Sequence, residues 1–253
     1  MKRSALPWLL GLGGLFLLFG LWWLGVALFG AGDGLAALFS PQATLASLVE
    51  LLGRGELYQH VGVSLRRILV GLSLALLVGV PLGLLVGAWR SLEWATTPAF
   101  QFLRMISPLS WMPVAVMLMG VGDRPIYFLL AFAAVWPILL NTAAGVKSLD
   151  PRWLQLTHSL SATRRETLTR VVLPGVLGHV LTGVRLAIGI LWIVLVPCEM
   201  LGVSAGLGYY ILDTRDRLAY SELMAMVLLI GVLGFCLDAA ARALYRRWSH
   251  APG

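Results

Sequence analysis

Long runs of apolar residues separated by short polar segments make up most of the chain. Five nearly uninterrupted runs cover residues 6–30, 64–89, 126–146, 177–201 and 221–244. Each has about the 20 residues that a helix needs to span the hydrocarbon core of a bilayer. A sixth run, over 98–120, is interrupted by polar residues and prolines. The pattern predicts an all-α, polytopic membrane protein of about six transmembrane helices.

The interruptions in the sixth run predict a broken helix. Ser107-Pro108, Ser110 and Pro113 all fall inside this run. A helix broken by prolines and hydroxyl side chains lies against protein or a water-filled cavity, because its freed backbone groups need partners. We therefore expect this segment to line protein or a water-filled cavity and not to face lipid.

The run over 64–89 carries a small-residue pattern. Gly79, Gly83 and Gly87 recur every four residues, the spacing that allows two membrane helices to approach closely. Plain helix packing is the simplest interpretation of these glycines. Pro81 within the same run predicts a kink.

Two polar segments carry helix signals of their own. Ser40-Pro41, followed by leucines at helical spacing, predicts a short amphipathic helix at the membrane surface. Asp150-Pro151 places proline at the first helical position, which predicts a short helix over 153–161. This second helix lies in the most charged internal segment, 147–177. A purely structural connection needs fewer than about 6 residues, so docking of a soluble partner is the alternative to a structural role.

These elements divide the chain into three parts. We expect residues 1–60 to form an N-terminal transmembrane helix and a surface amphipathic segment. Residues 61–247 are expected to form the membrane core, with 147–177 as a cytoplasmic loop. Residues 248–253 would then be a cytoplasmic tail.

The composition agrees with a membrane location. Of the 253 residues, 59% are hydrophobic and 12% charged, whereas soluble domains carry about a quarter charged residues. The net charge of +7 does not indicate nucleic-acid binding, because the basic residues form no stripe with interleaved aromatics. Cys198 and Cys236 both lie in apolar runs, so buried thiols are expected, with no disulfide framework and no metal site.

The distribution of Lys and Arg predicts the orientation, since these residues are enriched in cytoplasmic loops. With a cytoplasmic N-terminus, twelve of the nineteen fall on the cytoplasmic side and Arg185 lies near a membrane face. The remaining six fall on the outer side: Arg54, Arg66, Arg67, Arg124, Arg215 and Arg217. Both termini are therefore expected in the cytoplasm, although Arg66 and Arg67 run against the trend.

The segment 147–177 resembles the signature loop of the membrane permeases of binding-protein-dependent ABC importers. That signature reads E-A-A, three residues, G, nine residues, I, any residue, L-P. Leu173-Pro174 match its end, Val171 stands at the Ile position and Ser161 at the Gly position. Gln155-Leu156-Thr157 then stand at E-A-A, so the spacing fits while the Glu and Gly are replaced.

Sequences on both sides of this loop look like the nitrate, taurine and aliphatic-sulfonate branch of that family. The similar stretches are 107–113 (SPLSWMP), 181–189 (LTGVRLAIG) and 199–202 (EMLG). Two further stretches, 135–142 (VWPILLNT) and 209–213 (YYILD), are similar to the nitrate-type members. The resemblance covers about residues 63–247.

The resemblance implies a type I ABC importer permease in the bacterial inner membrane, which is a transport subunit and not an enzyme. The implied substrate is a small anion, with nitrate first and nitrite, cyanate and bicarbonate possible. The alternative is a permease for taurine or aliphatic sulfonates. The implied partners are a second permease chain, identical to this one, two ABC ATPase subunits, a periplasmic or lipid-anchored binding protein, and membrane lipid.

No cofactor is implied in this chain, and ATP and Mg would be bound by the partner ATPase subunits. The residues agree, because the phosphate-binding motif G-x-x-x-x-G-K-[ST] is absent and neither Lys2 nor Lys147 follows a glycine. The resemblance places ATPase docking on the short helix and the residues after it: Asp150, Pro151, Arg152, Trp153, Leu154, Gln155, His158, Ser161, Ala162 and Thr163.

Five residues are candidates for the translocation path or its gate: Ser107, Ser110, Trp111, Asn141 and Glu199. Neutral donors can pass an anion without trapping it, although plain packing is the alternative for the first four. Glu199 is an ionisable group within an apolar run, which usually faces a cavity or a partner. A carboxylate is a poor ligand for an anion, so we expect a gate or a scaffold that holds the following loop. Arg104 could contact an anion, but snorkelling to the membrane surface is the commoner behaviour.

Two other classes of function remain open. An ATP-independent channel or secondary transporter would show an inverted repeat or paired charges at the bilayer midplane, and neither is visible in the sequence. A membrane-embedded enzyme would need a catalytic constellation such as paired intramembrane acids, whereas Glu199 stands alone and His179 has no accompanying metal ligands.

Overall fold

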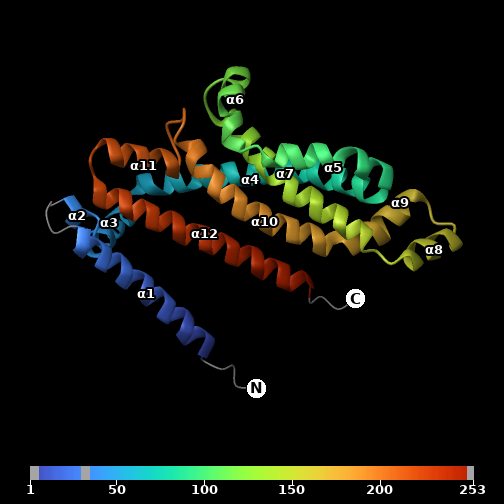
Figure 1. Ribbon diagram of the computed structural model, residues 1–253, viewed down its shortest axis with the longest axis horizontal. Helices are drawn as coiled ribbons and strands as arrows, with labels where there is room; N and C mark the ends of the chain where they lie inside the picture. The colour runs from blue at the N-terminus through green and yellow to red at the C-terminus, as the bar shows by residue number, and fades with distance from the viewer. Residues whose placement is uncertain (1–5, 30–34, 250–253) are drawn as a thin grey trace. The chain divides into compact units, whose positions relative to one another are not determined.

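The computed structural model describes residues 6–29 and 35–249, and its regular elements are all helices (Figure 1). In chain order they are α1 (Leu6–Phe29), α2 (Leu35–Leu38), α3 (Pro41–Leu52), α4 (Gly55–Ala88), α5 (Arg90–Met105), η1 (Pro108–Trp111), α6 (Met112–Met119), α7 (Asp123–Lys147), α8 (Pro151–Ser159), α9 (Arg164–Thr167), η2 (Leu168–Val172), α10 (Leu173–Glu199), α11 (Leu207–Asp216) and α12 (Tyr220–Ser249). The all-α prediction is confirmed. Lys2, Arg3 and most of the predicted tail lie outside the described residues.

Four helices in the described part of the chain are long and apolar enough to cross a membrane. They are α4, α7, the continuous stretch Arg164–Glu199 and the segment Tyr220–Ala243 of α12. The pair formed by α5 and Pro108–Met119 bends by 86° at its break and would make a fifth span if counted as one. The apolar part of α1, Phe16–Leu28, is shorter than the length needed to count as a membrane span. The expected number of about six is therefore matched approximately.

The broken run has the break where the sequence predicts it. α5 ends at Met105, and Pro108 and Pro113 each stand near the start of the next helical segment. Proline is tolerated there, since the first N–H groups of a helix have no intrahelical partner. In Figure 1, α6 turns away from α5 at this point.

Contacts within the chain divide it into two compact units. The first comprises Met1–Gln59 and Tyr210–Gly231. Within it the indole N–H of Trp22 donates to the carbonyl of Phe39 at 3.0 Å, and the Phe39 and Tyr220 rings lie 5.3 Å apart. The predicted amphipathic helix is α3, whose N-cap Ser40 accepts a hydrogen bond from the Ala43 N–H at 3.3 Å.

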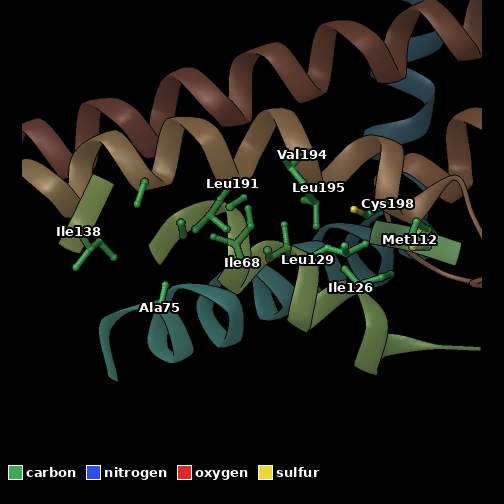
Figure 2. Close-up of a cluster of buried hydrophobic side chains, with 14 residues drawn as sticks. Ile68, Ala75, Met112, Ile126, Leu129, Ile138, Leu191, Val194, Leu195 and Cys198 are labelled. Atoms are coloured by element: carbon green, nitrogen blue, oxygen red, sulfur yellow. The ribbon is translucent and has the colours of Figure 1, made fainter. Parts of the chain in front are cut away.

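The second unit comprises His60–Tyr209 and Val232–Gly253 and holds the apolar core. Figure 2 shows side chains of α4, α7 and α10 meeting there, among them Ile68, Leu129 and Leu191. The helices approach closely at glycines: a Cβ added at Gly83 of α4 would lie 2.6 Å from the carbonyl oxygen of Leu139 in α7. At Gly183 of α10 it would lie 2.9 Å from the Ile138 Cα. The close approach expected from the small-residue pattern is confirmed.

Several elements differ from the sequence prediction, among them the short helix expected over 153–161, which is α8 at Pro151–Ser159. α4 begins at Gly55, nine residues before the expected start at 64, and α5 begins at Arg90 instead of 98. The polar residues before 64 were predicted to lie outside the helix, but His60, Ser64 and Arg67 recur at helical spacing and find partners inside the protein. The segment expected to be a loop after Glu199 contains the helix α11, because the side chains of α4 and α10 bind its first N–H groups.

Candidate functional site

The carboxylate of Glu199, the last residue of α10, is completely buried and fully engaged in hydrogen bonds. Its oxygens accept from the Ser64 hydroxyl at 2.7 and 2.8 Å and from Arg67 Nη1 at 2.8 Å. They also accept from the backbone N–H of Gly208 at 2.9 Å. Glu199 therefore links α4, α10 and the start of α11.

Arg67 extends this arrangement to α7. Its guanidinium is 3% exposed and donates to Asp123 Oδ1 from Nε at 2.9 Å and from Nη2 at 2.6 Å. Nη1 also donates to the carbonyl of Ala205 at 2.6 Å. Asp123 in turn accepts from Arg66 Nη2 at 2.5 Å. We call Ser64, Arg66, Arg67, Asp123 and Glu199 the Arg67 network.

The charges of the Arg67 network balance, with two guanidinium groups and two carboxylates. A buried ion pair costs desolvation energy, and removal of one partner is strongly destabilising because it leaves an uncompensated charge. The network has its partners in place, so it can hold three helices together. Arg67 therefore has a structural role, whichever side of the membrane the count of Lys and Arg assigns it to.

The loop between α10 and α11 folds tightly around the Arg67 network. Gly206 has a φ of +123°, and a Cβ added there would lie 2.4 Å from Glu199 Cδ. A Cβ at Gly208 would lie 2.2 Å from the carbonyl oxygen of Val196. Only glycine leaves the space that the carboxylate and the backbone of α10 occupy.

Three successive backbone N–H groups of this loop are bound by side chains. Gly206 N–H donates to Nδ1 of His60 at 3.1 Å, Leu207 N–H to the Ser64 hydroxyl at 2.9 Å, and Gly208 N–H to Glu199. The first N–H groups of a helix have no intrahelical acceptor and attract negative charge. The start of α11 is therefore capped from α4 and α10.

This geometry bears on the two roles expected for Glu199. The carboxylate holds the following loop through hydrogen bonds, as the scaffold interpretation expects. It does not line any cavity described in the chain, and Arg67 compensates its charge. A gating role needs movement of these partners and stays a prediction.

The other path candidates lie elsewhere. Asn141 lines a cavity of about 330 Å³ between the end of α5, η1, α7 and α10. Its Nδ2 donates to the carbonyl of Pro137 at 2.7 Å. Trp111 packs against Phe132, with 5.9 Å between ring centroids, and its indole N–H is buried without an acceptor in the described chain. Ser107 and Ser110 are exposed at the break of the helix.

The segment predicted to dock an ATPase forms a short exposed helix. Asp150 caps α8 by accepting from the Arg152 N–H at 2.9 Å, as the sequence predicts. Trp153, Leu156 and Leu160 are 59%, 51% and 71% exposed. They line a groove of about 470 Å³ together with Thr157, Ser161, Ala162, Glu166, Arg170 and Val171. Figure 1 shows α8 beyond the ends of α7 and α10.

The backbone explains the glycine at one position of the signature loop. Ser161 has a φ of +52°, a left-handed conformation that favours glycine. A glycine at this position of the signature thus matches the backbone, and Ser161 adopts the same conformation without it. Gln155, at the Glu position, is exposed on α8. His158 is exposed on the same helix, and Thr163 forms a capping box with Glu166 after it.

Sequence reasoning missed most of the Arg67 network. Arg67 was counted as a topology signal, and Ser64, His60 and Asp123 were not candidates. The available signal was the presence of two ionisable residues of opposite charge, Arg67 and Glu199, in separate apolar runs. Intramembrane charges usually pair with one another, so this pairing could have been proposed from the sequence.

The sequence comparisons identify the family. A family model described as "Binding-protein-dependent transport system inner membrane component" matches residues 79–250. The chain is 35% identical over 199 residues to the bicarbonate transport system permease protein CmpB of Synechococcus elongatus, covering 78% of this chain and 70% of CmpB. It is 31% identical over 245 residues to the taurine transport system permease protein TauC of Escherichia coli, covering 94% and 88%. The nitrate import permease protein NrtB of Leptolyngbya laminosa is 29% identical over 183 residues, covering 72% and 66%.

A solved structure supports the fold. The chain resembles a chain of the inward-facing MetNI methionine ABC transporter with a TM-score of 0.61, covering 76% of this chain and 95% of that one. Because the two are 17% identical, this likeness speaks for the fold alone. The predicted type I ABC importer permease fold and the resemblance to the nitrate, taurine and sulfonate branch are both confirmed. This chain belongs to the family of binding-protein-dependent transport system inner membrane components.

Proposed function

We propose that this chain forms the translocation path for a small anion in an ABC importer, with nitrate as the first substrate and nitrite, cyanate and bicarbonate as further ones. The substrates named in its relatives support this class, since bicarbonate, nitrate and taurine are all small and carry an anionic group. Taurine or an aliphatic sulfonate is the second candidate, because the match to TauC covers 94% of the chain.

The observation that carries the transport role is the exposed helix α8 between two membrane-spanning helices. Trp153 and Leu156 on the nine-residue α8, and Leu160 directly after it, present an apolar surface to solvent. Exposed apolar patches of this kind mark interaction sites. We assign Asp150–Thr163 as the docking site for an ABC ATPase, so two copies of the permease would bind two ATPase subunits.

Close packing of α7 and of Leu149, two residues after it, against α10 supports a mechanical link from this docking site. Leu149 lies so near Gly175 that an added Cβ would be 2.5 Å from its Cδ2. A Cβ at Gly145 would lie 2.8 Å from His179 Cβ. Two helices packed this tightly move together. A displacement of α8 on ATP binding would therefore be passed to α7 and α10 as a pair.

ATP and Mg belong to the partner subunits in this proposal, and the chain supplies no cofactor of its own. A second, identical permease chain would complete the path, and a periplasmic or lipid-anchored binding protein would deliver the anion. Both termini are proposed to lie in the cytoplasm, which places α8 on the ATPase side. The Arg67 network would then lie on the outer side and shape the surface around the loop after α10.

The experiment is a measurement of ATP hydrolysis by the reconstituted permease–ATPase complex with its binding protein. Nitrate, nitrite, cyanate, bicarbonate and taurine are titrated separately. Stimulation by nitrate is expected, and stimulation by taurine alone would favour the second candidate. A folded complex that hydrolyses ATP but responds to none of these anions would remove the anion assignment.

A further inference from the structure

A cavity in the second unit combines an unpaired cation with apolar walls. It has a volume of about 330 Å³ and is lined by Arg104, Phe132, Trp136, Leu140, Asn141 and Ile190, among others. Ligand sites typically occupy about 300–1,000 Å³ and pair a mostly apolar lining with a few polar groups. The cavity has this composition, and no Asp or Glu lines it.

Arg104 is the charged group of the cavity. It stands in the last turn of α5 and, among the described residues, forms no ion pair. Some other basic residues of this unit do have carboxylate partners: Arg67 binds Asp123 and Glu199, and Lys147 binds Glu93. The Arg104 guanidinium therefore offers its donors to a ligand without competition from a protein carboxylate.

Trp136 forms one wall of the cavity and carries a second unused donor. Trp136 is 8% exposed, and its indole N–H is itself buried and has no acceptor in the described chain, so the ring has to turn for this N–H to reach a ligand in the cavity. A buried N–H group without an acceptor is rare in proteins and calls for an explanation such as a ligand. The ring packs against Phe132 and Phe100, at centroid distances of 5.6 and 5.7 Å.

Asn141 uses one of its hydrogen-bond donors within its own helix. Its Nδ2 already donates to the carbonyl of Pro137 on its own helix. Arg104, Trp136 and the second N–H of Asn141 Nδ2 thus remain as the donors for a ligand. Snorkelling to the membrane surface would account for Arg104 alone, but it leaves the unpaired indole N–H of Trp136 unexplained.

We propose that this cavity is a binding site for a small oxyanion, in which Arg104 pairs with the charge and the Trp136 indole N–H donates to one oxygen. The proposal rests on the anion transport proposed above and identifies where the anion binds within the membrane core. Leu140 and Ile190 offer no hydrogen bonds to replace those lost to water. The site therefore favours anions that dehydrate easily, such as nitrate, over bicarbonate.

A neighbouring cavity suggests how the site continues toward α8. It has a volume of about 230 Å³ and shares Arg104 and Leu140 with the first cavity. Its other charged residues, Glu93 and Lys147, form an ion pair with each other. Arg104 is consequently the unpaired charge at the junction of the two cavities.

Anion binding to the nucleotide-free permease–ATPase complex in nanodiscs tests this site. Sodium nitrate and sodium bicarbonate are each equilibrated with the complex by dialysis, and bound anion is measured by ion chromatography. Saturable nitrate binding is expected, with weaker bicarbonate binding. Arg104→Gln and Trp136→Phe should each weaken nitrate binding by about tenfold or more, because each removes a hydrogen-bond donor to a charged ligand.

Matched controls are available on the same helix as Arg104. Arg90 and Trp94 form a cation–π contact at 4.9 Å and line neither cavity, so Arg90→Gln and Trp94→Phe should bind nitrate as the wild type does. Arg104→Lys keeps the charge and should retain part of the affinity. Should Trp136→Phe fail to assemble, Arg104→Gln and Arg104→Lys decide alone, since Arg104 is exposed and its replacement should leave the fold intact.

The outcomes separate this site from the transport proposal. Unchanged nitrate affinity in Arg104→Gln would overturn the site, and unchanged affinity in Trp136→Phe would overturn the donor role of the indole. If nitrate still stimulates ATP hydrolysis of those variants as in the wild type, the transport proposal stands and the site falls. If no anion stimulates the wild-type complex, the transport proposal itself fails.

Discussion

Arg67 and Glu199 form an ion pair at 2.8 Å between side chains that are 3% and 0% exposed. The two residues lie 132 positions apart in the sequence, so this pair connects α4 to the end of α10. Asp123 of α7 binds the same guanidinium, so α7 is connected as well. The start of α11 is then held through Ser64 and Glu199.

Arg66 and Arg67 offer a direct comparison of an exposed and a buried charge. Both bind Asp123, but Arg66 is 59% exposed whereas Arg67 is 3% exposed. Arg67→Gln should lower the free energy of unfolding by about 3–5 kcal/mol, because it leaves Glu199 buried without its counter-charge. Arg66→Gln should change it by about 1 kcal/mol or less. Unfolding of the purified protein in a denaturing-detergent titration measures both, and equal losses would contradict a structural role for the buried pair.

Gly206 should not tolerate a side chain. Gly206→Ala would place a Cβ 2.4 Å from Glu199 Cδ at a φ of +123°, so a loss of about 1–3 kcal/mol is expected from strain and overpacking. At Gly178 in α10, an added Cβ would meet no neighbouring atom within 4 Å. Gly178→Ala should stabilise the helix by about 0.5–1 kcal/mol. Thermal unfolding should therefore shift in opposite directions for the two variants.

Ser161→Gly should stabilise the loop after α8. Ser161 has a φ of +52°, and a left-handed conformation costs a residue with a side chain about 1–2 kcal/mol. Glycine removes that cost, so amide hydrogen exchange over residues 159–167 should slow. Faster exchange in Ser161→Gly would contradict a left-handed backbone conformation at this position.

The docking assignment of α8 is tested by Trp153→Ala and Leu154→Asp. Trp153 is 59% exposed and Leu154 37% exposed, so neither change should unfold the chain. Loss of an aromatic anchor and insertion of a charge into an apolar interface should each weaken ATPase co-purification by about tenfold or more. Leu218→Asp serves as control, because Leu218 is 66% exposed outside this loop. Full retention of the ATPase in both α8 variants would show that the loop is not the docking site.

Hydropathy predicted the membrane-spanning helices because a bilayer imposes a length and an apolar composition on them. It placed α12 within one residue of its start, at Ser221 instead of Tyr220. It could not predict α11, since that helix is short and its first N–H groups depend on Ser64 and Glu199 from distant parts of the chain.

In the candidate sites too, features that are local in sequence were predicted and those that depend on tertiary contacts were not. Capping by Asp150 is local in sequence and was predicted from two adjacent residues. Glu199 was singled out as a charge in an apolar run, but its partners Ser64 and Arg67 required the tertiary structure. Trp136 became a candidate only when its indole N–H was found without an acceptor, which no sequence pattern reports.

Anion uptake into proteoliposomes tests the central claim most directly. Liposomes carry the permease–ATPase complex with ATP on the side of the ATPase subunits, and the binding protein and nitrate are supplied on the opposite side. We expect nitrate to accumulate only when both ATP and the binding protein are present, with a non-hydrolysable ATP analogue giving no accumulation. Equal nitrate entry without ATP or without the binding protein would contradict the importer account and favour an ATP-independent channel.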